Sequence, residues 1–247
     1  MKIIISPAKK MNVDTDVFGH IELPVFLSRT KELMNYMKGL TFAEAKKLWG
    51  CNDKIAEQNF KRYASMDLER GLTPAIISYE GIQYQYMSPM VLSEEGLDYI
   101  QKHLRILSGF YGILKPFDGV TPYRLEMQTK ASVDGFKDLY DFWGDSLCQE
   151  LTSDGDHVIL NLASKEYSKC IEKYVGKDDS FVTCVFGEMA DGKVIQKGTL
   201  AKMARGEMVR YLAENQIESL EGVKGFSGLG YSFSCELSSD KEYVFLK

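Results

Sequence analysis

The sequence lacks the clustered cysteines and histidines that mark disulfide-stabilised proteins and zinc sites. Its five cysteines are widely spaced, odd in number and form no C-x-x-C pair, and only three histidines are present. Such spacing argues against a disulfide framework and against a preformed zinc site. We therefore expect reduced thiols without a disulfide partner, no bound metal and no cofactor.

Long apolar runs and an excess of positive charge are also missing. No apolar run approaches the ~20 residues that span a bilayer, and the three isoleucines near the start are too few for the apolar core of a signal peptide. These absences predict a cytoplasmic protein with no membrane partner. The 30 Lys and Arg residues against 35 Asp and Glu give a net charge of −5, so a polyanion site would require a local concentration of cations.

What the 247 residues do contain is an alternation of helical and strand patterns, with no repeat, low-complexity tract or linker between them. Apolar runs predict strands at 2–5, 74–81 and 157–163, and hairpins at 180–198 and 231–247. Capping signals and periodicity predict helices at 24–40, 41–50, 53–66, 93–104, 137–152, 164–176 and 199–216. We expect an α/β (α+β) fold with residues 1–247 in a single domain, in which helices flank a mixed sheet.

The stretch LRILSGFYGILKPFDGVTPYRLEM, residues 104–127, places glycines, prolines and cations between two apolar runs. Gly109 and Gly112 allow a tight turn, which either connects core elements or presents backbone amides to phosphates. In either case the segment is expected to carry Arg105, Lys115 and Arg124 along one rim.

The end of this stretch, around Tyr123, is the most pointed candidate for a site. If the chain is extended there, Arg124 and Glu126 lie on the same side because side chains alternate. The arginine would then grip a carboxylate or phosphate, while Glu126 orients it or acts as a base. The alternative is an internal Arg–Glu pair that holds the turn.

Two further segments follow predicted strands, where α/β sheets place their ligand sites. In ISPAK, Ser6 offers a hydroxyl group and Lys9 a charge, although a strand-ending turn with solvated lysines has the same pattern. In NLASKEY, Asn161 and Ser164 lie where a strand gives way to a helix. The first amides of that helix bind either an anion or the Ser164 side chain as a cap.

The predicted helix at 199–216 carries Lys202, Arg205 and Arg210. Gly206 lies in its interior, where glycine costs about 1 kcal/mol relative to alanine. Close approach of another backbone or of a ligand would account for this glycine. An exposed cationic face that merely tolerates it is the alternative.

Three carboxylates repeat at helical spacing in KDLYDFWGD. Asp138, Asp141 and Asp145 share one face of a predicted helix. Hard oxygen ligands on one face are able to hold Mg²⁺ or ferrous iron. A solvated acidic face is the simpler interpretation.

The segments ISPAK, LRILSGFYGILKPFDGVTPYRLEM, KDLYDFWGD, NLASKEY, ARGEMVRY and GFSGLGYSF, taken in this order, closely resemble the YaaA family of bacterial peroxide stress proteins. The resemblance runs from residue 1 to the last hairpin. It implies a role in the oxidative stress response and iron homeostasis, by limiting the free iron that drives Fenton damage.

The resemblance also implies an unusual topology, in which a helix–hairpin–helix-like element lies beside a positively charged cleft that binds double-stranded DNA. The hairpin corresponds to Gly109 and Gly112. The implied cations of the cleft are Lys9, Arg105, Lys115, Arg124, Lys202, Arg205 and Arg210.

DNA binding is therefore the first hypothesis for the cleft. The alternative is an enzyme that acts on a small anionic or nucleotide-like substrate, with Glu126 as the candidate acid/base and Lys9 as a stabiliser of developing charge. No nucleophile–base pair is evident, so no reaction and no catalytic activity are assigned. Direct iron binding ranks last, because clustered His, Cys and Glu ligands are lacking; equilibrium dialysis against ferrous iron tests it.

Overall fold

The computed structural model describes residues 1–14 and 19–247. In its main sheet, β1 (Lys2–Ile5) lies between β8 (Val158–Leu162) and β5 (Leu104–Ser108) and is parallel to both. The order is β11-β12-β9-β8-β1-β5-β6, and β10 pairs with β9. The other strands of this sheet are β6 (Gly112–Leu114), β9 (Ser180–Ala190), β10 (Lys193–Ile195), β11 (Ser232–Phe233) and β12 (Glu242–Leu246).

The sheet is mixed and mostly parallel, which confirms the predicted fold class. The pairs β8–β9 and β9–β12 are parallel, whereas β5–β6, β9–β10 and β11–β12 are antiparallel. Two small ladders lie outside it: β2 (Lys10–Met11) pairs with β4 (Tyr79–Glu80), and β3 (Thr73–Pro74) pairs with β7 (Gly119–Val120).

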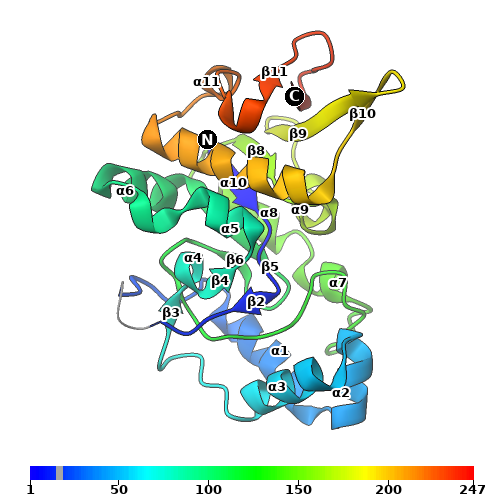
Figure 1. The fold of residues 1–247 in the computed structure, drawn as a ribbon. Helices are drawn as coiled ribbons and strands as arrows, with labels where there is room; N and C mark the ends of the chain where they lie inside the picture. The colour runs from blue at the N-terminus through cyan, green and yellow to red at the C-terminus, as the bar shows by residue number, and fades with distance from the viewer. Residues whose placement is uncertain (15–18) are drawn as a thin grey trace.

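Helices surround the sheet (Figure 1). The first three gather at the bottom of the view, away from α10 near the top, and α10 packs against α5 and α6. The bounds are α1 (Leu27–Gly39), α2 (Phe42–Trp49), α3 (Asp53–Ala64), α4 (Ala75–Ser78), α5 (Ile82–Met87), α6 (Glu94–His103), α7 (Leu139–Trp143), α8 (Ser146–Thr152), α9 (Lys165–Glu172), α10 (Gly198–Glu214) and α11 (Leu220–Val223), with 3₁₀ turns at Pro89–Val91 and Gly228–Gly230.

The predicted helix starts are confirmed where a polar side chain caps the first turn. Thr41 and Glu44 form the reciprocal capping box of α2, and Asn52 and Ser93 accept hydrogen bonds from the first turns of α3 and α6. Ser164 precedes α9 but makes no cap bond. Its prediction as a simple cap is therefore wrong.

Two predicted elements are interrupted. Residues 74–81 do not form one strand, because the turn α4 separates β3 from β4; the amide of Ala75 donates to the Asp118 carbonyl at 2.9 Å. The predicted helix 137–152 breaks into α7 and α8 at Gly144, which has φ +54°. A residue in the left-handed region ends a helix because it turns the chain out of the helical path.

The helix–hairpin–helix-like element is not confirmed. Gly109 lies in the turn between the strands β5 and β6, and Gly112 is the first residue of β6; both glycines are buried. The amides of Phe110 and Tyr111 donate to the Ser108 hydroxyl oxygen at 3.2 and 2.9 Å. These two donors are therefore satisfied inside the protein instead of facing a phosphate.

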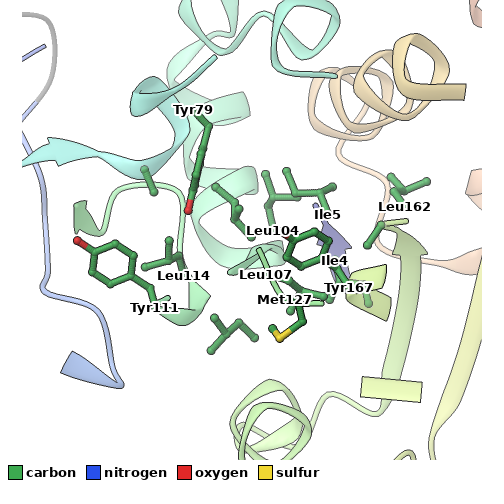
Figure 2. Close-up of a cluster of buried hydrophobic side chains, with 14 of the residues drawn as sticks. Ile4, Ile5, Tyr79, Leu104, Leu107, Tyr111, Leu114, Met127, Leu162 and Tyr167 are labelled. Atoms are coloured by element: carbon green, nitrogen blue, oxygen red, sulfur yellow. The ribbon is translucent and has the colours of Figure 1, made fainter. Parts of the chain in front are cut away.

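The core forms around β1, all four residues of which are buried. Figure 2 shows Ile4 and Ile5 beside Leu104 and Leu107 of β5 and near Tyr167 of α9. The cluster of buried apolar side chains includes Met1 at one end of the chain and Phe245 at the other. Core packing thus holds β1 along its whole length.

Gly206 allows α10 to lie directly against α5. A Cβ atom at this position would overlap the Gln83 carbonyl oxygen and would lie 3.0 Å from the Met87 amide. Both obstacles are backbone atoms, so a side-chain rotation does not relieve them. Close approach of another backbone, one of the two reasons expected for this glycine, is confirmed.

The Gly206→Ala variant should lose roughly 1–3 kcal/mol of stability, because the added methyl group forces α5 and α10 apart. The free energy of unfolding in urea measures this loss. Gly198→Ala is the matched control: it lies in the same helix with nothing within 4 Å of its Cβ position, and should be neutral or stabilising by up to about 1 kcal/mol. Equal stabilities of the two variants would contradict the proposed contact.

Candidate functional site

The candidate site begins at the carboxyl ends of β1 and β8. In the sheet, β5 and β6 lie on one side of β1, whereas β8, β9 and β12 lie on the other side. The direction in which strands are added therefore reverses between β1 and β8. Open α/β sheets bind ligands in the crevice at such a switch point. Ser6 follows β1 and Ser164 follows β8, and the Ser164 amide donates to the Ser6 hydroxyl oxygen at 2.8 Å.

A pocket of about 390 Å³ opens at this crevice. Its walls come from the segments after β1 and β8, from α5, from residues 123–126 and from α10. Eight residues singled out in the sequence line it: Ser6, Lys9, Tyr123, Arg124, Glu126, Ser164, Lys202 and Arg205. Cations from three distant segments therefore meet at one concave surface.

Glu126 lies between two of these cations. Its carboxylate is 3.0 Å from Lys9 Nζ and 3.0 Å from Arg124 Nη2. The internal Arg–Glu pair therefore exists, and it also faces the pocket. Arg124 and Glu126 are only 15% and 17% exposed, whereas Lys9 is 63% exposed.

Gly109 places this ion pair. A Cβ atom at Gly109 would lie 2.5 Å from the Leu125 carbonyl oxygen and 2.9 Å from the Met127 amide nitrogen. The turn between β5 and β6 therefore packs directly on the backbone of 125–127. A residue with a side chain at 109 would force the backbone of 125–127 to shift, and Glu126 with it.

Arg205 lines the pocket without a counterion among the described residues. Its Nε is buried and has no hydrogen-bond partner among the residues that the structure describes. Burial lowers the pKa of the guanidinium group, although arginine stays charged at neutral pH. A buried charge without a partner costs free energy, which an anion in the pocket would recover.

A cluster of tyrosines supports the pocket floor. The Tyr123 hydroxyl group lies 2.7 Å from both the Tyr79 and the Ser108 hydroxyl oxygens, and Tyr84 donates to the Ser6 carbonyl at 3.0 Å. Burial raises the pKa of Tyr123 to about 12. Tyr123 is therefore neutral at physiological pH and holds the wall in place.

Several pocket residues were not singled out in the sequence, among them Gln83, Tyr84 and Glu166. Burial raises the pKa of Glu166, whose carboxylate accepts the Gln128 amide at 3.3 Å. Glu166 lies inside the NLASKEY motif, so the motif itself was the available signal. Gln83 had no such signal, because its place depends on the contact with Gly206.

Other predicted site residues lie elsewhere. Arg105 and Lys115 line a separate hollow of about 170 Å³, so the expected single rim with Arg124 does not form. Asn161 lines a second large hollow, and Arg210 pairs with Glu214 at 2.8 Å and does not line the pocket. Gly109 and Gly112 allow the tight turn between β5 and β6, in which Gly112 has a φ of +77°.

The predicted acidic stripe is divided between two short helices. Asp138 accepts the Asp141 amide at 2.9 Å as the cap of α7, while Asp145 accepts the Gln149 side chain at 2.7 Å. Within residues 1–14 and 19–247, no three His, Cys, Asp or Glu side chains are grouped to hold a metal ion. All five cysteines have free thiols.

The same part of the chain contains no helix of the length and apolarity that crossing a membrane requires. A model for the family described as peroxide stress protein YaaA matches residues 1–237. The chain belongs to this family. The predicted resemblance to YaaA proteins is thus confirmed.

Relatives of similar length carry the name UPF0246 protein. One from Lachnoclostridium phytofermentans is 58% identical over all of this chain and 96% of its own length. Others are from Agathobacter rectalis, 56% identical over 99% of this chain and 98% of its own, and from Desulfitobacterium hafniense, 55% identical over 100% and 98%.

The hollow lined by Arg105 and Lys115 also contains the carboxyl group of Asp118. Its ionisation should make the stability of the protein depend on pH. Asp118 is buried, and burial raises its pKa to about 7 despite the Lys115 amide that it accepts at 2.9 Å. Lys115 and Arg105 also lower this pKa, while Glu22 raises it. The unfolded chain releases the same proton near pH 4.

Between about pH 4 and pH 7 the folded state therefore holds a proton that the unfolded state has lost, so stability should fall as the pH rises through this window. Asp118→Asn should remove much of the decline, roughly 2–4 kcal/mol, because the amide cannot ionise. Urea unfolding at pH 5, 6, 7 and 8 measures the difference. Parallel pH profiles for the two proteins would contradict the raised pKa.

Proposed function

We propose that the pocket between β1 and β8 binds a small anionic ligand, of phosphate to nucleotide size, as part of the response to hydrogen peroxide. Its volume of about 390 Å³ lies in the range of small-molecule sites. Five cations line it against three carboxylates, in a protein whose net charge is −5. The observation that carries the proposal is Arg205, a largely buried cation that has no counterion within the described part of the chain.

The individual groups have distinct roles in this proposal. Arg205 anchors the anion, and Lys202 adds charge from the same helix. Lys9 is exposed enough to leave Glu126 and bind the ligand, which frees one side of that carboxylate to accept or donate a proton. No His or Cys lines the pocket among the described residues, so Glu126 and Lys9 are the candidates for any catalytic step.

Isothermal titration with inorganic phosphate tests the anion site. Arg205→Gln should weaken binding roughly tenfold or more, since a charge-assisted hydrogen bond contributes about 1.5–3 kcal/mol. Arg210→Gln removes a cation from the same helix outside the pocket and should change the affinity less than about twofold. Absence of phosphate binding by the wild type, or equal effects of both changes, would refute the proposal.

The physiological part of the proposal is that anion binding in this pocket serves to limit free iron and so reduces Fenton damage. The same two variants test it in cells that lack the native protein. Wild type and Arg210→Gln should lower chelatable iron during peroxide exposure, whereas Arg205→Gln should not. If Arg205→Gln restores iron levels as well as wild type does, the pocket is not the site of that activity.

Double-stranded DNA is the second candidate ligand, and exposed ammonium groups at the pocket favour it. Lys9 and Lys10 are 63% and 70% exposed, and Lys202 is exposed without an ion pair within the described residues. Such groups contact backbone phosphates and do not read bases. Arg105, Lys115 and Arg210 lie outside the pocket and extend this surface only if the DNA spans several hollows.

Filter binding to duplex DNA at several salt concentrations tests this candidate. Affinity should fall with salt, with a log–log slope of about −0.9 per phosphate contacted, and Lys202→Ala should reduce the slope by about one. Lys54→Ala, an exposed lysine on α3 far from α10, is the control (Figure 1). If the protein does not bind duplex DNA at low salt, or if its affinity does not change with the salt concentration, the DNA hypothesis is eliminated.

A further inference from the structure

A second, larger hollow adjoins the pocket. It has a volume of about 930 Å³ and is bounded by β8, β9, α9 and residues 239–242. Arg205 lines both cavities, so its guanidinium group lies at their junction. A ligand held by Arg205 in the first pocket therefore has space beside it.

The two cavities differ in charge. Five cations face three carboxylates in the pocket, whereas four cations face four carboxylates in the second hollow. Some charged groups of the second hollow already pair with each other, such as Lys165 with Glu172 at 2.6 Å. The pocket suits an anionic group, and the second hollow suits an uncharged one.

Neutral hydrogen-bonding groups line the second hollow. Asn161 donates to the Thr183 hydroxyl oxygen at 3.1 Å and accepts the Ala163 amide at 2.8 Å, which fixes both side chains across β8 and β9. Gln196 and Ser239 add an exposed amide and a hydroxyl group. Amides and hydroxyl groups supply both donors and acceptors, which match the hydrogen-bonding groups of sugar hydroxyls and base edges.

We propose that the two cavities form one bipartite site for a nucleotide: its phosphate binds Arg205 on the side of the cationic pocket, and its nucleoside occupies the hollow beside Thr183 and Gln196. This inference rests on the proposed anion site and narrows its ligand class. It also gives Asn161 a role, as the residue that holds Thr183 in position.

Isothermal titration with inorganic phosphate, ribose 5-phosphate and the four common ribonucleoside monophosphates tests the inference. At least one nucleotide should bind ten times more tightly than phosphate and than ribose 5-phosphate. Thr183→Val and Gln196→Ala should each reduce this advantage at least threefold and leave the phosphate affinity unchanged. Gln149→Ala, an exposed amide on α8 that lines neither cavity, should change nothing.

Two results overturn the bipartite site while the anion site survives. In one, phosphate binds in a manner sensitive to Arg205→Gln, but no nucleotide binds more tightly. In the other, a nucleotide does bind more tightly, but neither Thr183→Val nor Gln196→Ala affects it. If neither phosphate nor any nucleotide binds, the anion site itself fails and the inference fails with it. Circular dichroism confirms that each variant is folded.

Discussion

The parallel pairing of β1 with both β5 and β8 is the constraint on which the candidate site depends. It brings the residues after β1 and β8 to the same edge of the sheet, so that Ser6 and Ser164, 158 positions apart, share a hydrogen bond. Because β1 is buried along its whole length, the strand cannot shift without exposing its isoleucines. The crevice is therefore as fixed as the core beneath it.

Gly109 and Gly206 let backbone segments pack closely against each other, and this packing fixes the positions of the two pocket arginines. Gly109 lets the β5–β6 turn rest on the backbone of 125–127, which sets Arg124, and Gly206 lets α10 rest on α5, which sets Arg205. Each contact is between backbone atoms, where small displacements meet steep repulsion and leave little freedom of position. A site held in this way loses less conformational entropy when a ligand binds.

Much of the local structure could be predicted from the sequence, because it depends on neighbours along the chain. Alternation in an extended segment was enough to pair Arg124 with Glu126, and side-chain caps marked the starts of α2, α3 and α6. The interrupted segment 74–81 was missed since its partners, β2 and β7, are remote in sequence. Lys115 was misplaced for the same reason: its partner Glu22 lies 93 residues away, and only the fold brings the two together.

The two arginines of the pocket differ in what an anion must displace. At Arg124 an incoming anion competes with Glu126, which is already within 3.0 Å and largely shielded from water, so much of the attraction is offset by a broken ion pair. At Arg205 no carboxylate stands in the way among the residues described, and the desolvation of the guanidinium group has already occurred on folding. Binding free energy should therefore come mainly from Arg205, while Arg124 and Glu126 set the orientation of the ligand. In the proposed anion site, the decisive contact is therefore Arg205, a largely buried cation with no carboxylate paired to it among the residues described.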